Sequence, residues 1–309
     1  MKKLLNSYAF DLSPRVPLQL GRESIASSST AITELVKNSY DADSNLVEIS
    51  FHKLDKPVPI LIIEDNGNGM SPEMLISSWL KIGTENKVRN SISDKGRILT
   101  GAKGLGRLGI DRLCRRMILQ TKTKNSDTIL QLDIDWKKYE DSGKSFFDIK
   151  HNLYSLPYPY SDKYGTALKN GQGTRIILVG LKDDWTGYLS KDLKRDLRLL
   201  VSPFFAKDEF QIKIADDSEE STRLDSSEIL DYARWSVSAS INDDHSISTT
   251  YKYNNEEVKT INEPWANFIT NRFSKPTCGS LEFKLYFIPR ESVNDMDLNV
   301  KHIRSFMDA

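Results

Sequence analysis

The spacing of apolar positions changes along the chain and predicts two kinds of element. Between residues 22 and 41, apolar side chains recur every three to four positions, which predicts a helix. Short apolar runs bounded by turn-forming residues predict strands at 46–51, 60–64, 117–123, 128–135, 145–150 and 173–181. Short polar turns between most of the later strands favour antiparallel neighbours. Helices followed by a run of strands predict an α+β sandwich with helices on one face of a mixed, mostly antiparallel sheet.

Further helices are indicated by caps and stops. Ser71-Pro72-Glu73 places a hydroxyl cap before a proline, the pattern of a helix start. A second helix is expected over residues 106–115, and a third, rich in Leu and Lys, over residues 188–200. Residues 83–105 lack periodicity and are rich in Gly, Ser, Asn and Lys, so we predict a long mobile loop of the kind that often serves as a lid.

The second part of the chain carries fewer signals. Pro203 is a natural helix stop, and we place a domain boundary there, between residues 1–203 and residues 204–309. The second region contains two strand-like segments, F-Q-I-K-I and L-E-F-K-L-Y-F-I, around a polar middle. No sharp motif occurs in it, so its function has to be inferred from the first region.

Composition narrows the class of protein. Among 309 residues, Lys+Arg and Asp+Glu both number 43, so no global charge attracts nucleic acid. Two cysteines and four histidines without metal-like spacing argue against a disulfide framework and a zinc site. No apolar stretch approaches the roughly 20 residues needed to span a bilayer, and the start of the chain lacks a signal-peptide core. We therefore predict a cytoplasmic protein without membrane contact.

The first motif lies on the predicted helix, in E-L-V-K-N-S-Y-D-A-D. Glu34, Asn38 and Asp41 follow at i, i+4 and i+7 and form one polar stripe. Glu34 can act as a general base that orients water, and Asn38 offers the oxygen ligand that Mg²⁺ accepts. Asp41 can hold the neighbouring turn by hydrogen bonds. Taken alone, the stripe has an alternative interpretation as a solvated helix face.

The second motif is I-I-E-D-N-G-N-G-M. Asp65 ends a strongly apolar strand, where a partly buried carboxylate can accept a hydrogen bond from an adenine amino group. Gly67 and Gly69, which precede Met70, permit unusual backbone conformations and close ligand approach. The alternative is an ordinary D-N-G hairpin turn, but a capped helix follows instead of a strand.

The third motif is the glycine-rich G-A-K-G-L-G-R-L-G. Its glycines match the dinucleotide-binding spacing, but no strand precedes them, and the lysine and hydroxyl residue of a P-loop do not follow Gly106. What remains is a loop whose backbone N–H groups can hold phosphates, with Lys103 adding charge. The alternative is a flexible linker.

In this order, the three motifs resemble the ATP site of the gyrase, heat-shock chaperone, histidine kinase and MutL superfamily, the GHKL or Bergerat-fold ATPases. The resemblance covers roughly residues 20–182. It implies a catalytic role for Glu34, magnesium coordination by Asn38, and adenine recognition by Asp65 supported by Thr174 of G-Q-G-T. It implies that ATP and Mg²⁺ are bound with the help of the other motif residues: Asp41, Gly67, Gly69, Met70, Gly101, Lys103, Gly104, Leu105 and Gly106.

The resemblance further implies a lid at residues 83–106 and ATP-dependent homodimers. Glu34 favours hydrolysis, because histidine kinases generally lack this glutamate and need a phosphoacceptor histidine, and none occurs before Glu34. The glycine-rich motif is most similar to MORC-type and related prokaryotic ATPases, which suggests DNA or a protein as a further partner and, by analogy, a role in prokaryotic defence.

For residues 204–309 the resemblance predicts a smaller, truncated α/β transducer domain. In hydrolysing branches such a domain sends a lysine to the γ-phosphate, and no convincing lysine-bearing loop is found here. Two alternatives therefore stand beside an ATPase: a protein kinase of the histidine-kinase type, and a non-hydrolysing nucleotide sensor or scaffold.

Overall fold

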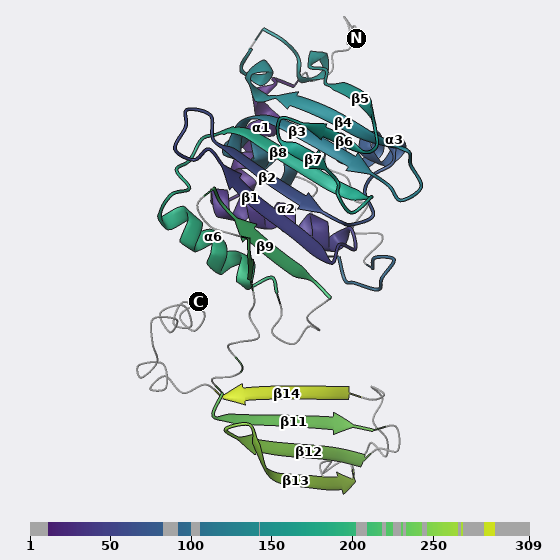
Figure 1. The fold of residues 1–309 in the computed structure, drawn as a ribbon, viewed down its shortest axis with the longest axis vertical. Coiled ribbons are helices and arrows are strands. Elements are labelled where there is room, and N and C mark those ends of the chain that lie inside the picture. The colour runs from purple at the N-terminus through teal and green to yellow at the C-terminus, as the bar shows by residue number, and fades with distance from the viewer. Residues whose placement is uncertain are drawn as a thin grey trace, which may run out of the picture. The chain divides into compact units, whose positions relative to one another are not determined.

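The protein forms two compact units. The computed structural model describes residues 12–82, 92–99, 106–141, 143–201, 209–217, 221–224, 230, 233–242, 246–264, 267 and 281–287. Contacts assign Met1–Val201 and Phe205–Leu224 to the first unit, and Ser202–Phe204 and Asp225–Ala309 to the second (Figure 1). The motif residues Gly101, Lys103, Gly104 and Leu105 lie outside the described residues, as do 83–91 of the predicted lid.

An eight-stranded sheet organises the first unit, in the order β10-β9-β1-β2-β8-β3-β4-β5. Neighbouring strands are antiparallel, except that β9 runs parallel to β1. The strands are β1 (Leu46–His52), β2 (Ile60–Asp65), β3 (Cys114–Lys122), β4 (Thr128–Asp135), β5 (Asn152–Pro157), β8 (Gly173–Leu181), β9 (Gln211–Ala215) and β10 (Thr222–Leu224). The predicted α+β class with a mostly antiparallel sheet is confirmed.

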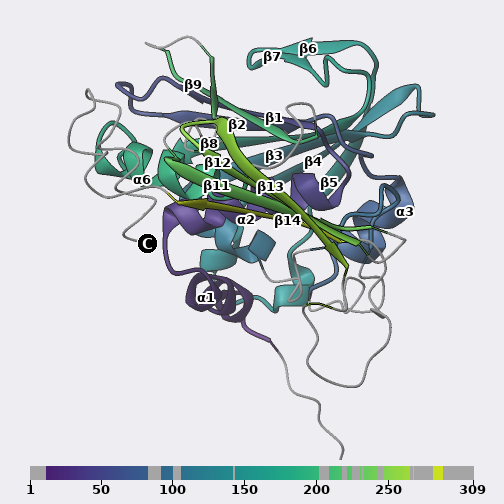
Figure 2. The same cartoon turned by 90° about the horizontal axis from the view of Figure 1, so that it is seen from below.

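Helices cover one face of this sheet, and a small hairpin covers part of the other (Figure 2). The hairpin consists of β6 (Tyr160–Asp162) and β7 (Gly165–Ala167). The α-helices are α1 (Arg15–Ser24), α2 (Ser28–Asp41), α3 (Pro72–Met74), α5 (Ile110–Leu113) and α6 (Tyr188–Arg198). Shorter turns are η1 (Leu75–Trp79), η2 (Gly106–Gly109), η3 (Trp136–Glu140) and η4 (Phe146–Asp148).

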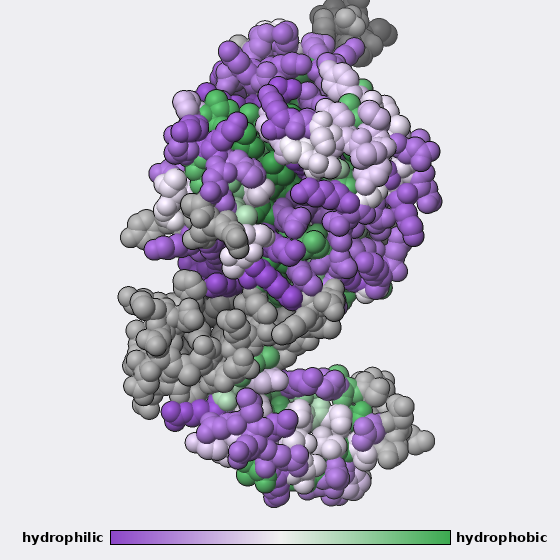
Figure 3. All heavy atoms as spheres, in the orientation of Figure 1, coloured by the Kyte–Doolittle hydropathy of each residue, from purple (hydrophilic) through white to green (hydrophobic). Residues whose placement is uncertain are grey.

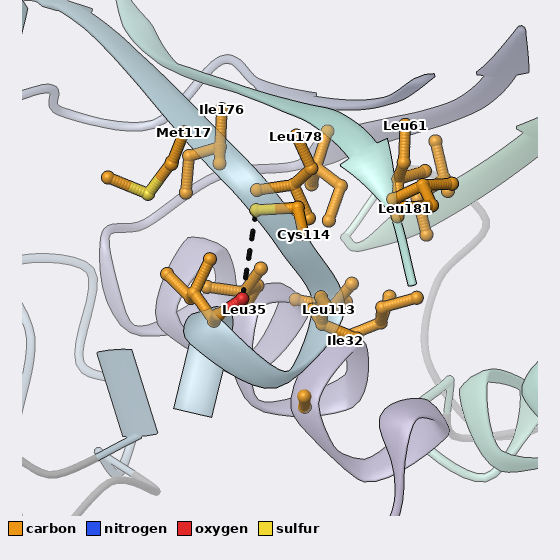
Figure 4. Close-up of a cluster of buried hydrophobic side chains, with 14 of the residues drawn as sticks. Ile32, Leu35, Leu61, Leu113, Cys114, Met117, Ile176, Leu178 and Leu181 are labelled. Atoms are coloured by element: carbon orange, nitrogen blue, oxygen red, sulfur yellow. Dashed lines mark hydrogen bonds between the residues drawn. The ribbon is translucent and has the colours of Figure 1, made fainter. Parts of the chain in front are cut away.

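The core lies between α2 and the sheet. Ile32 and Leu35 project from α2 toward apolar side chains of β2, β3 and β8, including Leu61 and Leu178 (Figure 4). Cys114 is buried among them, and its thiol donates to the Ile110 carbonyl at 3.7 Å. Burial raises the pKa of this thiol to about 12, so it behaves as a small apolar side chain. This packing fixes α2 relative to the strand ends.

The single helix predicted over residues 22–41 is in fact two helices. Ile25 has extended backbone angles, φ −124° and ψ 110°, which end α1. The Ser27 side chain then accepts a hydrogen bond from the Thr30 N–H and caps α2. The apolar period continued through the break because residues on both helices face the same core, so periodicity alone concealed the boundary.

Two other predicted elements differ from the structure. Residues 145–150 were expected to form a strand, but Phe146–Asp148 is a 3₁₀ turn closed by a capping box between Ser145 and Asp148. The helix expected over 106–115 is a 3₁₀ turn followed by Ile110–Leu113, and Cys114 already begins β3. In the second case the strand pairing with β8 ends the helix early.

The first unit extends past the boundary expected near Pro203. β9 pairs with β1 from Leu46↔Gln211 to Ser50↔Ala215. Ile212 and Ile214 of β9 are buried in the same core as the helices. β10 adds one more short strand to that edge. The compact first unit therefore runs to Leu224.

The second unit contains a four-stranded antiparallel sheet, ordered β13-β12-β11-β14. Its strands are β11 (Trp235–Ile241), β12 (Ser246–Tyr253), β13 (Glu256–Pro264) and β14 (Leu281–Phe287). Alternate residues of β14 are apolar and exposed, and they pair with the apolar positions of β11. Hydrophilic residues predominate on the faces seen in Figure 3. Among the described residues, no helix has the length and apolar character that crossing a bilayer requires.

Candidate functional site

The carboxylate of Asp65 joins three segments that are far apart in the sequence. It is buried at the end of β2. Its Oδ2 accepts a hydrogen bond of 2.8 Å from the Ser39 hydroxyl on α2. Its Oδ1 accepts from the backbone N–H of Gly67 at 2.9 Å and of Thr174 at 3.2 Å. The first two sequence motifs and the G-Q-G-T segment therefore meet at one side chain.

Burial and hydrogen bonding act on Asp65 in opposite directions. Burial raises the pKa of the carboxyl, because it disfavours the charged form, and this is the largest effect. The hydrogen bonds from Gly67, Ser39 and Thr174 lower the pKa, since they stabilise the carboxylate. The net pKa lies above the ordinary value. A buried carboxyl group with a raised pKa is typical of a functional position.

Thr121 holds the turn that follows Asp65. It lies on β3 directly opposite Thr174 of β8, and the two hydroxyl oxygens are 3.1 Å apart. The Thr121 hydroxyl accepts from the backbone N–H of Met70 at 2.9 Å and donates to the Gly173 carbonyl at 3.0 Å. Its side chain is buried. It thereby fixes the end of the glycine turn against β3 and β8.

The glycines of this region are required by close contacts between backbones. A Cβ on Gly67 would lie 2.6 Å from the Ala42 carbonyl oxygen. A Cβ on Gly69, whose φ is +65°, would lie 2.1 Å from the Lys122 carbonyl oxygen. A Cβ on Gly173 would lie 1.9 Å from the Asp65 carbonyl oxygen. These glycines hold the strand ends together, a packing role beside the ligand approach expected from the sequence.

The polar stripe of α2 lies on the side away from its core residues. Glu34 is half-buried, and its Oε1 lies 2.9 Å from the Nζ of Lys37. Asn38 is exposed and Asp41 is half-buried. Ser39, which binds Asp65, follows Asn38 directly. With a rise of about 1.5 Å per residue, Glu34 is displaced about 7.5 Å along the helix from the residue that contacts Asp65.

Asp43, just past the end of α2, connects the glycine turn to residues 92–99. Its carboxylate accepts from Asn68 Nδ2 at 3.3 Å, from the Ser93 hydroxyl at 2.5 Å and from the Lys95 N–H at 3.3 Å. Its φ of 61° is in the left-handed region. Asp43 therefore holds the glycine turn against residues 92–99.

Arg97 anchors the same segment more deeply. Its buried guanidinium donates to the carbonyl oxygens of Tyr40 at 3.1 Å, Ser44 at 2.6 Å and Glu209 at 2.7 Å. The guanidinium carbon also lies 4.5 Å from the centre of the Tyr40 ring. Residues 92–99 of the predicted lid are thus attached to the end of α2.

Of the glycine-rich motif, the structure describes only the end. Gly106 begins η2, and Arg107 follows it. The Arg107 guanidinium donates to the Lys81 carbonyl, while its buried Nε has no partner among the described residues. Burial lowers the pKa of Arg107 to about 10. An anion beside this loop would accept a hydrogen bond from the Arg107 Nε and would balance the charge of the buried guanidinium. The residues therefore fit a phosphate group.

The donor set also fits magnesium held mainly by phosphates. Within the described part of the chain, no group of three or more His, Cys, Asp or Glu side chains could hold a metal by itself. Mg²⁺ often takes one or two protein oxygens and completes its shell with phosphates and water. The exposed amide of Asn38 offers such an oxygen.

This geometry agrees with a comparison against known proteins. Residues 26–153 match the family model described as histidine kinase-, DNA gyrase B- and HSP90-like ATPases. The match supports a place for this region in the GHKL superfamily, and it points to ATP as the ligand. A putative type II restriction enzyme, HgiDII from Herpetosiphon aurantiacus, is 35% identical over 167 residues, which are 53% of this chain and 24% of that protein. The chain thus spans about a quarter of the length of that relative.

Several residues of the site escaped the sequence interpretation. Ser39 stands beside Asn38 on α2, but no local pattern pairs it with Asp65, 26 positions later. Thr121 carries no local signal, because its role depends on the β3–β8 register. Gln172, whose side chain donates to the Gly67 carbonyl at 3.0 Å, likewise becomes visible only when residues 67 and 172 are brought together.

Proposed function

We propose that the first unit binds ATP with Mg²⁺ and hydrolyses it. The observation that carries this proposal is the convergence of Ser39, Gly67 and Thr174 on the buried carboxylate of Asp65. It brings the α2 motif, the glycine turn and β8 to one point, in the order that the superfamily resemblance requires. Asp65 would accept from the adenine amino group, and Thr174 would support that contact.

In this proposal the phosphates extend from Asp65 along α2 toward Glu34. Glu34 accepts a proton from water as the water oxygen attacks the γ-phosphorus, and the bond from this phosphorus to the bridging oxygen of ADP breaks. The products are ADP and inorganic phosphate. Mg²⁺, held with the help of Asn38, would neutralise charge on the phosphates. Gly67, Gly69 and Met70 shape the base side, and Gly101, Lys103, Gly104, Leu105 and Gly106 would hold phosphate oxygens.

The test compares Glu34→Gln and Asp65→Asn with the parent in phosphate release and in nucleotide affinity. Glu34→Gln should lower phosphate release by about 100-fold or more, with ATP binding no weaker than in the parent. Asp65→Asn should lose ATP binding. Glu48→Gln is the control, because Glu48 also pairs with a lysine, Lys213, but on β1 and β9. Parent-like phosphate release by Glu34→Gln would refute the role of Glu34.

A cycle of lid closure and homodimerisation is part of the same proposal. The attachment of residues 92–99 to Asp43 and Tyr40 supports it, since nucleotide-dependent changes near α2 would reach this segment directly. Light scattering with and without a non-hydrolysable ATP analogue measures the oligomeric state. A monomer at saturating analogue would count against the dimer.

Two other outcomes correspond to other functions. Transfer of the labelled γ-phosphate to a protein would identify a histidine-kinase-type activity, which the family description includes. Tight ATP binding without phosphate release would identify a sensor or scaffold. For the further partner, the relative named as a restriction enzyme favours DNA. Binding to duplex DNA that weakens with salt would support this, and the MORC-like assignment and transducer role of residues 204–309 stay predictions.

A further inference from the structure

The contact between Lys37 and Glu34 places a cation beside the proposed catalytic carboxylate. The Nζ of Lys37 and the Oε1 of Glu34 are 2.9 Å apart, and the two side chains are 34% and 33% exposed. The residues are three positions apart on α2, so they share its polar face with Asn38. Lys37 therefore belongs to the surface along which the proposed nucleotide lies.

Stability alone gives little reason for this ion pair. Half-exposed ion pairs within one helix contribute little to the free energy of unfolding. The helix is already fixed by its buried residues and by the Ser27 cap. Contact with the proposed nucleotide therefore explains the position of Lys37 next to Glu34 better than a contribution to stability does.

Three other described cations near the motifs, Lys95, Lys122 and Arg97, donate to backbone oxygens. Lys95 Nζ donates to the Asp43 carbonyl at 2.7 Å, and Lys122 Nζ donates to the Gly171 carbonyl at 2.7 Å. Arg97 donates to three carbonyls. These carbonyls are fixed parts of the fold. Lys37 instead contacts a side chain on its own helix, which can exchange its partner through a rotamer change.

We propose that Lys37 binds the γ-phosphate of ATP, and that Glu34 holds its ammonium until ATP arrives. The proposal rests on the proposed function, in which Glu34 lies one water molecule from the γ-phosphorus. An ammonium in contact with Glu34 is then within reach of the same phosphate, since the lysine stem is long and flexible. The multiply charged triphosphate competes for the ammonium with a single carboxylate. Its arrival releases Glu34 to accept a proton from water.

Lys37 is a candidate for the γ-phosphate lysine that the sequence analysis did not find. The lysine sought for the γ-phosphate was expected in residues 204–309. On α2, Lys37 would supply this charge from within the ATP-binding unit itself. The γ-phosphate would thus be recognised by the helix that also carries the proposed base and the proposed magnesium ligand.

The experiment measures the affinity of the full chain for ADP and for a non-hydrolysable ATP analogue by calorimetry. Lys37→Met keeps the apolar stem and removes the charge. It should weaken analogue binding at least about tenfold and change ADP binding less than about twofold, the loss expected for one charged contact. Lys37→Arg should retain most of the preference for the analogue. Lys213→Met, which breaks the pair with Glu48, should behave like the parent.

A second variant tests the competition directly. Glu34→Gln removes the partner that competes with the phosphate for Lys37, so it should tighten analogue binding several-fold without changing ADP affinity. In a chain that already carries Lys37→Met, Glu34→Gln should not tighten analogue binding.

The proposal would be overturned if Lys37→Met changed the affinities for the analogue and for ADP equally. It would also be overturned if Lys37→Met bound the analogue as tightly as the parent does, provided that the parent hydrolyses ATP. A parent that binds neither nucleotide would overturn both the proposed function and the role of Lys37. Thermal unfolding of each variant confirms that its fold is retained.

Discussion

The hydroxyl of Ser39 donates a 2.8 Å hydrogen bond to the carboxylate of Asp65, across 26 positions of sequence. This bond ties the middle of the polar helix α2 to the end of β2. Since Ser39 follows Asn38 directly, it also sets the position of the proposed magnesium ligand relative to the proposed adenine-binding carboxylate.

Ser39→Ala should lower both stability and ATP affinity. The substitution leaves one oxygen of a buried carboxylate without its side-chain donor, which costs about 1–3 kcal/mol. Urea denaturation measures the free energy of unfolding, and calorimetry measures ATP affinity. Ser161→Ala is the control, because the Ser161 hydroxyl bonds Thr166 on an exposed hairpin. Equal effects of the two substitutions would contradict a special role for Ser39.

Asp65→Asn should change the pH dependence of stability. Burial raises the pKa of Asp65 above 3.8, so the folded state binds more protons than the unfolded state between 3.8 and the raised pKa. The free energy of unfolding contributed by this group therefore falls as the pH rises through that window. The variant lacks the titration, so its stability relative to the parent should increase from about pH 3 to about pH 7. Urea titrations across this range measure the difference, and a constant difference would refute the raised pKa.

Gly69 and Gly96 form a matched pair for substitution by alanine. Both have positive φ, at +65° and +80°. A Cβ on Gly69 would collide with the Lys122 carbonyl, whereas the described residues leave open space where a Cβ on Gly96 would lie. Gly96→Ala should cost about 1 kcal/mol, the left-handed penalty. Gly69→Ala should cost at least about 3 kcal/mol and abolish ATP binding. Chemical denaturation distinguishes the two; similar losses would show that the close approach is not maintained in solution.

Arg97→Ala should destabilise the first unit much more than Arg116→Ala. Removal of the buried Arg97 side chain leaves the carbonyls of Tyr40, Ser44 and Glu209 without a donor, at a cost of about 3 kcal/mol or more. Arg116 pairs with Asp133 on the surface, where such a pair contributes less than about 1 kcal/mol. Denaturation of both variants gives the comparison. A loss below that of Arg116→Ala would contradict the anchoring role of Arg97.

The elements that were predicted well are those with strong local signals. The apolar runs of β2 and β8 are continuous, and the apolar residues of β4 mostly alternate with polar ones, so the bounds of all three strands were predicted within a residue. Ser71 and Pro72 predicted the start of α3 as a hydroxyl cap followed by proline, and the Ser71 side chain does accept from the Met74 N–H. β2 and β8 bury most of their length, and such burial leaves a readable pattern of apolar residues.

Elements governed by local caps or distant pairing were harder to predict. The apolar pair Phe146 and Phe147 indicated a strand, while the capping box of Ser145 and Asp148 formed a turn. In the second unit, β14 was expected from its apolar residues, whereas β11, β12 and β13 escaped prediction because many of their residues are polar and half-exposed or exposed, as in β12. In the site, Asp65 was predicted from its strand, but Thr121 depends on pairing across 53 positions. No short stretch of the sequence includes both Thr121 and Thr174, so their contact could not be predicted from a local pattern.

The parallel pairing of β9 with β1 has a consequence for synthesis of the chain. The ribosome makes α2, the glycine turn and β8 before it makes Gln211–Ala215. Until that segment leaves the exit tunnel, one edge of β1 has no strand partner, and Ile212 and Ile214 are missing from the core. The nascent chain therefore carries every motif of the nucleotide site before its sheet is complete, and ATP binding should begin only after translation has passed Leu224.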